Sequence, residues 1–315
     1  MNTELELVEV FDTTLRDGLQ VEGVSATVDD KLRIAEQLDH LGVHFIEGGW
    51  PGANPKDIEF FARALKELRL GSSTMVAFGS TRRPRGKVDD DATLRNLLDA
   101  QTAAVCIVAK SWDYQVTEAL QTTLDEGVAM IADSVEFLRG AGRMVMVDLE
   151  HFFDGYKRNP EFSLRAIEAA VVKGASHLVL CDTNGGSLPH EVSQIVADVK
   201  RHVGDDAVIG IHCHDDTGCA VANTMKGRGS GNDAASEVPR VSGMSTSRNS
   251  RSVRCSLRKI RASATLVQWP TTLSCPLFRQ QLRVNSAATI RSSTMTQFIV
   301  ILKWHYNRII FKWIV

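Results

Sequence analysis

Residues 7–18 read LVEVFDTTLRDG, an apolar run that passes directly into a cluster of polar residues. Such a run is typical of a strand that is buried on both faces of a parallel sheet. A doubly wound dinucleotide-binding sheet usually has a glycine-rich loop after its first strand, and DTTLRDG has no GxGxxG pattern. The stretch therefore favours a (β/α)8 TIM barrel, whose active site lies at the carboxyl ends of its strands.

The alternation of apolar runs and helical patterns continues to about residue 225. The expected strands are residues 7–11, 43–46, 74–78, 104–108, 144–149, 177–180 and 207–213. The expected helices are residues 28–41, 55–68, 91–100, 118–140, 163–173 and 189–203, with Thr27 and Asn54 as caps of the first two. Alternating elements predict parallel βαβ units, and seven strands are one short of a closed barrel.

Polar side chains gather at the carboxyl ends of these expected strands and not at their amino ends. Because those ends meet on one face of a barrel, the residues are expected to form the active site. In strand order they are Asp12, Arg16, Asp17 and Gln20; Glu47; Asp148, Glu150 and His151; Asp182, Thr183 and Asn184; and His212, His214, Asp215 and Asp216.

The pair His212 and His214 indicates a metal site. Residues two apart on a strand point to the same face, roughly 7 Å apart, so both rings can turn a nitrogen toward one ion. Asp17 would supply a third ligand, and the set is compatible with Mg²⁺, Mn²⁺, Zn²⁺ or Fe²⁺ without choosing among them. The alternative is two polar residues at a strand end.

Three further residues have two interpretations each. Arg16 could polarise a carbonyl or hold a carboxylate, or it could form a structural ion pair with Glu47. Glu150 could be a general base, or it could support a metal-bound water. Cys213 alternates away from the histidines, so we expect a core residue rather than a nucleophile.

Charge is divided unevenly along the chain. Residues 227–315 contain 14 Lys and Arg but only two acids, whereas residues 1–226 contain 22 basic and 36 acidic side chains. Residues 226–297 also lose the strand–helix alternation. We interpret residues 1–225 as an incomplete barrel domain and residues 226–315 as a basic tail foreign to it, either out-of-frame or disordered. No specific nucleic-acid binding is expected of such a tail.

Six cysteines contain no CxxC pair, which favours a reducing, cytoplasmic setting. The amino-terminal residues lack the apolar segment of a secretory signal, and no apolar run reaches membrane-spanning length. No membrane partner is therefore expected.

Three stretches in order resemble signatures of the DRE-TIM metallolyase superfamily: FDTTLRDGLQ (11–20), LVLCDTNGG (178–186) and IGIHCHDDTGCAVANT (209–224). This group includes 2-isopropylmalate, homocitrate and citramalate synthases and hydroxymethylglutaryl-CoA lyases. IEGGWPGANPKD (46–57), AKSWD (109–113) and DLEHFFDGYKRNP (148–160) resemble the citramalate synthase branch.

The resemblance implies an acyltransferase that condenses acetyl-CoA with pyruvate to (R)-citramalate and CoA, in branched-chain amino-acid biosynthesis. A 2-isopropylmalate synthase or related acyl-CoA lyase is the alternative. An alternative of another class is an inactive truncated barrel with a non-enzymatic basic tail. The same resemblance implies a homodimer if the chain is complete.

The resemblance also implies residue roles. Asp17, His212 and His214 would bind a divalent metal, Mg²⁺ or Mn²⁺ with Zn²⁺ as an alternative. Arg16 would stabilise an oxyanion and bind substrate, Glu47 would support it, and Glu150 would act in acid–base catalysis. Thr183 and Gln20 would bind substrate. A Gly-x-Gly-Glu-Arg-x-Gly-Asn signature that follows the eighth strand in the family has no counterpart in residues 226–315. A missing closing strand is therefore expected, and with it a chain that is unstable, poorly active or inactive.

Overall fold

The computed structural model describes residues 8–20, 23–229 and 309–313. Every element named below lies within residues 1–236 and 302–315, one of the two units of the chain. The interpretation of residues 226–315 as a foreign tail falls mostly outside the described residues, and the boundary at 225 stays a prediction.

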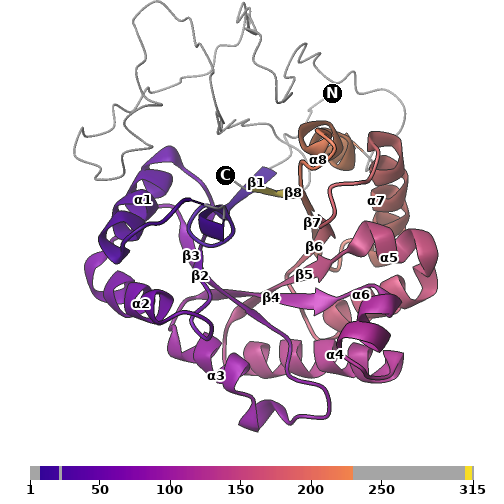
Figure 1. The fold of residues 1–315 in the computed structure, drawn as a ribbon, viewed down its shortest axis with the longest axis horizontal. Coiled ribbons are helices and arrows are strands. Elements are labelled where there is room, and N and C mark those ends of the chain that lie inside the picture. The colour runs from indigo at the N-terminus through magenta and orange to yellow at the C-terminus, as the bar shows by residue number, and fades with distance from the viewer. Residues whose placement is uncertain (1–7, 21–22, 230–308, 314–315) are drawn as a thin grey trace, which may run out of the picture. The chain divides into compact units, whose positions relative to one another are not determined.

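Within the described residues, eight parallel strands form a closed barrel in chain order (Figure 1). Seven of them lie where the sequence predicts strands, which confirms the barrel class. Their bounds are β1 Val8–Asp12, β2 Phe45–Gly49, β3 Thr74–Ser80, β4 Ala104–Lys110, β5 Met144–Glu150, β6 His177–Asp182, β7 Val208–Cys213 and β8 Ile309–Trp313.

The eighth strand comes from the carboxyl-terminal region of the chain. Ile309 is opposite Val8 of β1 on one side and opposite Ile209 of β7 on the other. The sequence predicts no closing strand, and in the structure β8 takes that place between β7 and β1. The segment reads IIFKW, and its β-branched and aromatic residues favour a strand. Its pairing covers the two edges that β1 and β7 would otherwise leave open.

Helices surround the barrel in Figure 1. They are α1 Val28–Leu41, α2 Pro55–Glu67, α3 Ala92–Asp99, α4 Leu124–Gly140, α5 Phe152–Arg158, α6 Pro160–Val172, α7 Pro189–Val203 and α8 Ala220–Gly229. Short turns of helix occur at η1 Gly18–Gln20, η2 Val88–Asp90 and η3 Gln115–Ala119. No helix among the described residues is long and apolar enough to cross a membrane.

The predicted caps are confirmed. Thr27 Oγ1 accepts a hydrogen bond from the Asp30 amide at 3.1 Å, and Asn54 Oδ1 accepts one from the Lys56 amide at 2.9 Å. The single helix expected over 118–140 is wrong at its start. The Thr123 side chain accepts from the Glu126 amide and begins α4 there, after the separate turn η3.

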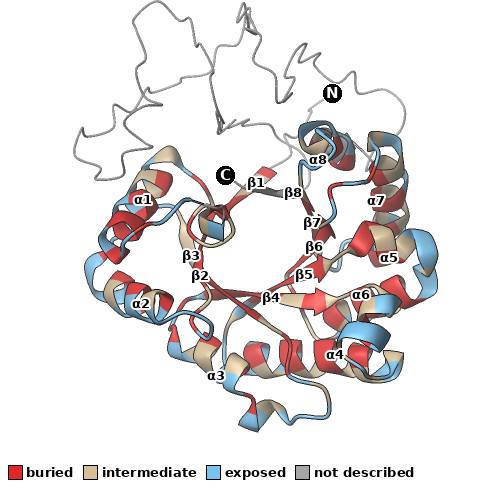
Figure 2. Ribbon diagram, viewed as in Figure 1, coloured by how far each residue is buried: buried red, intermediate tan, exposed pale blue. Residues whose placement is uncertain are grey.

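Two apolar clusters stabilise the barrel, a larger one between the strands and the surrounding helices and a smaller one inside the barrel. On β4, Val105, Ile107 and Ala109 belong to the larger, outer cluster, while Ala104 and Cys106 belong to the inner one. Residues of the inner cluster are Phe11, Phe45, Val76, Phe78, Ala104, Cys106 and Met146. In Figure 2 most residues of β1 to β7 have the colour of buried residues. The inner layer therefore fills the barrel beneath the polar strand ends.

A buried ion pair explains the IEGGWPGANPKD stretch. Lys31 Nζ on α1 lies 2.5 Å from Asp57 Oδ1 on α2, and Asp57 Oδ2 accepts from the Trp50 amide at 2.9 Å. Gly49 has φ 146°, and a Cβ there would lie 2.5 Å from Asp57 Cγ. Only glycine lets the chain turn this closely around the carboxylate. The motif thus joins β2 to its two neighbouring helices.

Candidate active site at the barrel mouth

Asp17, His212 and His214 come together at the mouth of the barrel, as the sequence predicts. One ligand atom of each lies within 4.8 Å of the others. His212 Nε2 is 3.6 Å from Asp17 Oδ2, and the two imidazole ring centroids are 4.9 Å apart. His212 is buried, whereas Asp17 and His214 are partly exposed.

This donor set fits a divalent cation. The 3.6 Å between His212 Nε2 and Asp17 Oδ2 is too long for a hydrogen bond. It suits two ligand atoms that each lie about 2.1 Å from one ion. Two imidazole nitrogens and one carboxylate oxygen bind Mg²⁺, Mn²⁺, Zn²⁺ or Fe²⁺, so these three residues could hold a metal ion.

Arg16 is held rigidly beside these residues. Its Nε lies 2.6 Å from Oε2 of the fully buried Glu47, Nη1 lies 3.4 Å from Asp17 Oδ1, and Cζ lies 3.9 Å from the Phe78 ring centroid. Burial acts to lower the pKa of Arg16, but Glu47 and Asp17 outweigh it and raise that pKa further above its ordinary value. The ion pair considered from the sequence is therefore formed. A guanidinium has five N–H donors, more than these two carboxylates use.

Glu150 forms an ion pair with Lys110 across neighbouring strands. The two residues are register partners at the ends of β5 and β4, and Lys110 Nζ contacts Glu150 Oε2. The Ser111 hydroxyl donates to the Glu150 carbonyl oxygen at 2.8 Å. Sequence reasoning missed Lys110. Its signal was a lysine directly after the apolar run of residues 104–109.

Thr183 joins the ends of β5 and β6. Its Oγ1 accepts a hydrogen bond from the backbone amide of His151 at 2.9 Å. His151 has a left-handed backbone, φ 52°, and its Nδ1 lies 3.5 Å from Asp154 Oδ2. Because the Thr183 oxygen accepts that bond, its hydroxyl proton can be donated to another group.

Two other residues of the expected site, Asp182 and Gln20, differ in their burial. Asp182 is fully buried and accepts from the Ser187 amide at 3.2 Å and the Ser187 hydroxyl at 3.0 Å. Gln20 is exposed at the end of η1, beside residues outside the described part of the chain, and its binding role stays a prediction.

Cys213 is a packing residue, as the sequence predicts. It packs against the outer apolar cluster. Burial and the Asp182 carboxylate raise the pKa of its thiol far above the ordinary value. A thiol in that state is a poor nucleophile.

Known proteins resemble the barrel region of this chain. The profile described as HMGL-like matches residues 7–239. The chain belongs to the HMGL-like family. Two similar proteins are (R)-citramalate synthases, from Aquifex aeolicus at 53% identity over 220 residues and from Streptomyces coelicolor at 55% over 216 residues. A 2-isopropylmalate synthase from Sulfolobus acidocaldarius is 31% identical over 220 residues.

These matches cover a larger share of this chain than of the relatives. The HMGL-like chain matches the Aquifex protein over 70% of its own length but 41% of that protein, and the Streptomyces protein over 69% and 40%. The Sulfolobus match covers 70% of the chain and 54% of that protein. The chain thus spans about two fifths of the length of the citramalate synthases.

A solved structure shares the fold of this HMGL-like chain. The HMG-CoA lyase of Bacillus subtilis superposes with a TM-score of 0.59 at 23% identity, over 72% of this chain and 75% of that one. At this level of identity the likeness supports the barrel alone.

Asp12, the last residue of β1, should make the free energy of unfolding depend on pH. Burial raises its pKa to about 6 from an ordinary 3.8; hydrogen bonds from Thr14 oppose this effect, and Glu47 adds to it. Between these values the folded state keeps a proton that the unfolded chain has released. Rising pH should therefore lower the free energy of unfolding, by up to about 3 kcal/mol. Urea unfolding between about pH 4 and 7 measures this.

The matched variant is Asp12→Asn, which keeps an oxygen acceptor for Thr14 but cannot ionise. Over the same pH range it should lack this loss of stability. Equal pH dependence in both proteins would show that Asp12 does not titrate in this window.

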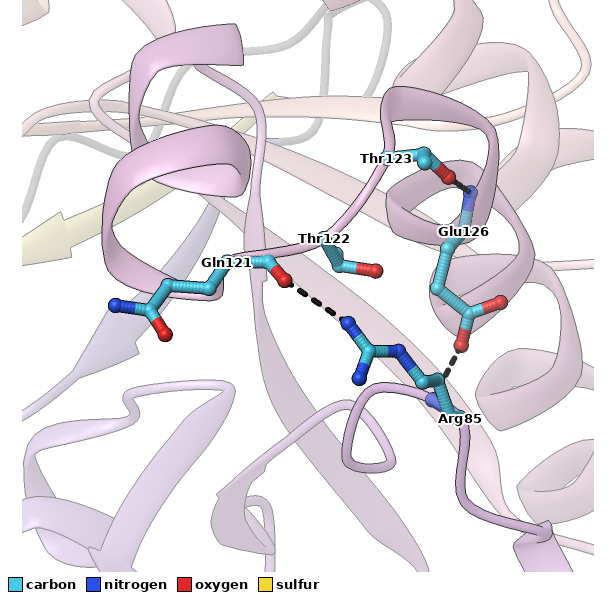
Figure 3. A pocket seen from close by; sticks show the side chains of 5 residues that line it. All are labelled: Arg85, Gln121, Thr122, Thr123 and Glu126. Carbon is cyan, nitrogen blue, oxygen red and sulfur yellow. Dashed lines mark hydrogen bonds between the residues drawn. The ribbon is translucent and has the colours of Figure 1, made fainter.

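The hollow in Figure 3 lies apart from this chemistry. It has a volume of about 400 Å³ and is lined by Arg85, Gln121, Thr122, Thr123 and Glu126. Arg85 Nη2 donates to the Gln121 carbonyl at 3.1 Å, and the Arg85 amide donates to Glu126 Oε1 at 2.7 Å. These contacts tie two connecting segments together. None of the five residues is a strand-end group of the site.

Proposed function

We propose that this chain condenses acetyl-CoA with pyruvate to give (R)-citramalate and CoA. The observation that carries the proposal is the contrast in similarity: 53% identity to an (R)-citramalate synthase against 31% to a 2-isopropylmalate synthase over 220 residues each. The cluster at the barrel mouth supports it. Asp17, His212 and His214 could hold a cation, and Arg16 supplies a positive charge beside them.

Asp17, His212 and His214 would hold the divalent cation, Mg²⁺ or Mn²⁺, with Zn²⁺ as the alternative. When bound there, the cation supplies Lewis-acid polarisation of a 2-oxo acid. Asp17 and His214 are partly exposed, whereas His212 is buried. A cation held by these three residues could therefore keep a coordination position open for substrate.

Arg16 would stabilise negative charge on the keto oxygen of pyruvate as the new carbon–carbon bond forms. Its guanidinium is fixed on two sides, by Glu47 at 2.6 Å and by the Phe78 ring at 3.9 Å. A donor that is fixed in advance does not have to reorganise during the reaction, which is what makes such stabilisation large.

Glu150 would remove a proton from the acetyl methyl group, and the resulting carbanion would attack the keto carbon. The ion pair with Lys110 orients its carboxylate. Thr183 would donate its hydroxyl to the pyruvate carboxylate, while Gln20 would contact substrate at the rim. Water then hydrolyses the thioester, and CoA leaves as the thiol. A cytoplasmic setting and a homodimer are further predictions.

Release of CoA thiol with two oxo acids tests the substrate. With Mg²⁺ or Mn²⁺ present, pyruvate should support faster release than 3-methyl-2-oxobutanoate, the larger acid of the isopropylmalate branch. Release without any oxo acid serves as the control for simple hydrolysis. Equal or reversed rates would exclude the citramalate assignment and favour the isopropylmalate alternative.

A further inference from the structure

Four buried side chains form a second cluster inside the barrel. Cys106 is 0% exposed, Asp148 3%, Cys181 4% and His212 4%. They come from four consecutive strands, β4, β5, β6 and β7. Ligand atoms of Asp148, Cys181 and His212 all lie within 4.8 Å of one another, and the Cys106 thiol donates to Asp148 Oδ1 at 3.2 Å.

The chemistry of this set differs from that of the mouth. It combines sulfur with nitrogen and oxygen, whereas the mouth offers only nitrogen and oxygen. Sulfur ligands select thiophilic cations such as Zn²⁺ and Cd²⁺, while Mg²⁺ and Mn²⁺ favour oxygen. Both cysteines are thiols rather than halves of a disulfide. A thiolate, a carboxylate and an imidazole are ligands that zinc accepts, and Cys106 places a second thiol beside them.

We propose that Asp148, Cys181 and His212, with Cys106 beside them, form a second metal site for thiophilic divalent cations. His212 belongs to this site and to the one at the mouth. A neutral imidazole has a single unprotonated ring nitrogen to offer. Occupation of one site therefore excludes full occupation of the other, and a thiophilic cation inhibits any activity that needs His212 at the mouth.

The spacing of the cluster is close to that of a metal site. Ligand atoms around a tetrahedral zinc lie about 3.5–4 Å apart, and those of Asp148, Cys181 and His212 all lie within 4.8 Å of one another. Cys181 and His212 are register partners on β6 and β7, which places their side chains next to each other. On binding, the Cys181 thiol releases its proton to solvent and its sulfur bonds to the cation. No electron is transferred, and no co-reactant is needed.

A cadmium titration of the full chain, reduced and stripped of metal, tests the site without using catalysis. The wild type should gain the ultraviolet charge-transfer band of a cadmium–thiolate bond at one equivalent. Cys181→Ser should weaken this binding by at least about tenfold, the loss that follows even from changes around a metal site. Cys219→Ser, at a partly exposed thiol outside the cluster, is the matched control and should bind like the wild type.

Competition with manganese tests the sharing of His212. Paramagnetic resonance of free Mn²⁺ should rise as Cd²⁺ is added to the Mn²⁺-loaded wild type, and Cys181→Ser should need about tenfold more Cd²⁺. Identical displacement in both proteins would overturn the proposal. A cadmium–thiolate band that forms while Mn²⁺ stays bound would overturn the exclusion.

Folding of the variant is checked in the same experiment. Far-ultraviolet circular dichroism and Mn²⁺ affinity of Cys181→Ser should match those of the wild type, and Cys181→Ala replaces it if they do not. Because all these readouts are binding, their outcome is independent of whether the chain condenses pyruvate.

Discussion

His212→Ala should abolish metal-dependent CoA release with pyruvate, with a fall of at least about 100-fold. The variant removes one of the three ligands whose atoms lie within 4.8 Å of one another at the barrel mouth. Asp17 and His214 alone would leave the cation with two protein ligands, both of which are partly exposed. The Mn²⁺ dissociation constant, measured by paramagnetic resonance, should rise together with the loss of rate.

The matched control is His40→Ala, which removes an exposed histidine in the last turn of α1. Its activity and Mn²⁺ affinity should stay within about twofold of wild type, as for other surface substitutions. Unchanged Mn²⁺ binding in His212→Ala would contradict the ligand assignment, even if the activity were lost.

Arg16→Lys should lower kcat by about 10²–10³-fold. An ammonium on a flexible stem cannot reproduce the planar fork that contacts Glu47 and lies over Phe78. The developing oxyanion then loses a fixed donor, while the metal ligands stay in place. We therefore expect Mn²⁺ affinity close to wild type together with a large loss of kcat.

Arg33→Lys is the control for this change, because Arg33 is exposed on α1. It should leave kcat and KM unaltered. If Arg16→Lys instead raises KM for pyruvate with kcat unchanged, Arg16 binds substrate without stabilising the transition state.

Much of the barrel could be predicted because its signals are local. Apolar runs mark the seven strands up to Cys213, and the capping residues Thr27 and Asn54 mark helix starts. The site followed from one rule, that the carboxyl ends of parallel strands meet on one face. That rule placed Asp17, His212 and His214 together although nearly 200 residues of sequence separate Asp17 from His212.

The features that could not be predicted depend on contacts between strands that are far apart in the sequence. β8 lies almost 100 residues after β7, and nothing local tells which strand edges IIFKW will join. The Lys110–Glu150 ion pair depends on the register between β4 and β5. In the same way, Cys106 and Cys181 look like isolated residues until the barrel aligns their strands.

The backbone at His151 is another feature without a local signal. Its left-handed conformation, φ 52°, is uncommon for histidine and begins the short helix α5. The conformation directs its amide toward Thr183, where the hydrogen bond is made at 2.9 Å. Such a bend arises from contact between two strand ends, and propensity alone cannot predict it.

The most direct test of the central claim is to follow the carbon atoms. The full chain is incubated with pyruvate, Mg²⁺ and acetyl-CoA that carries ¹³C in its methyl group, and the products are examined by carbon NMR. Condensation predicts that the label appears as a methylene carbon bonded to the hydroxyl-bearing carbon of citramalate, together with free CoA. Label that appears only in the methyl group of acetate, or that stays in acetyl-CoA, would contradict the proposal that this barrel forms a carbon–carbon bond.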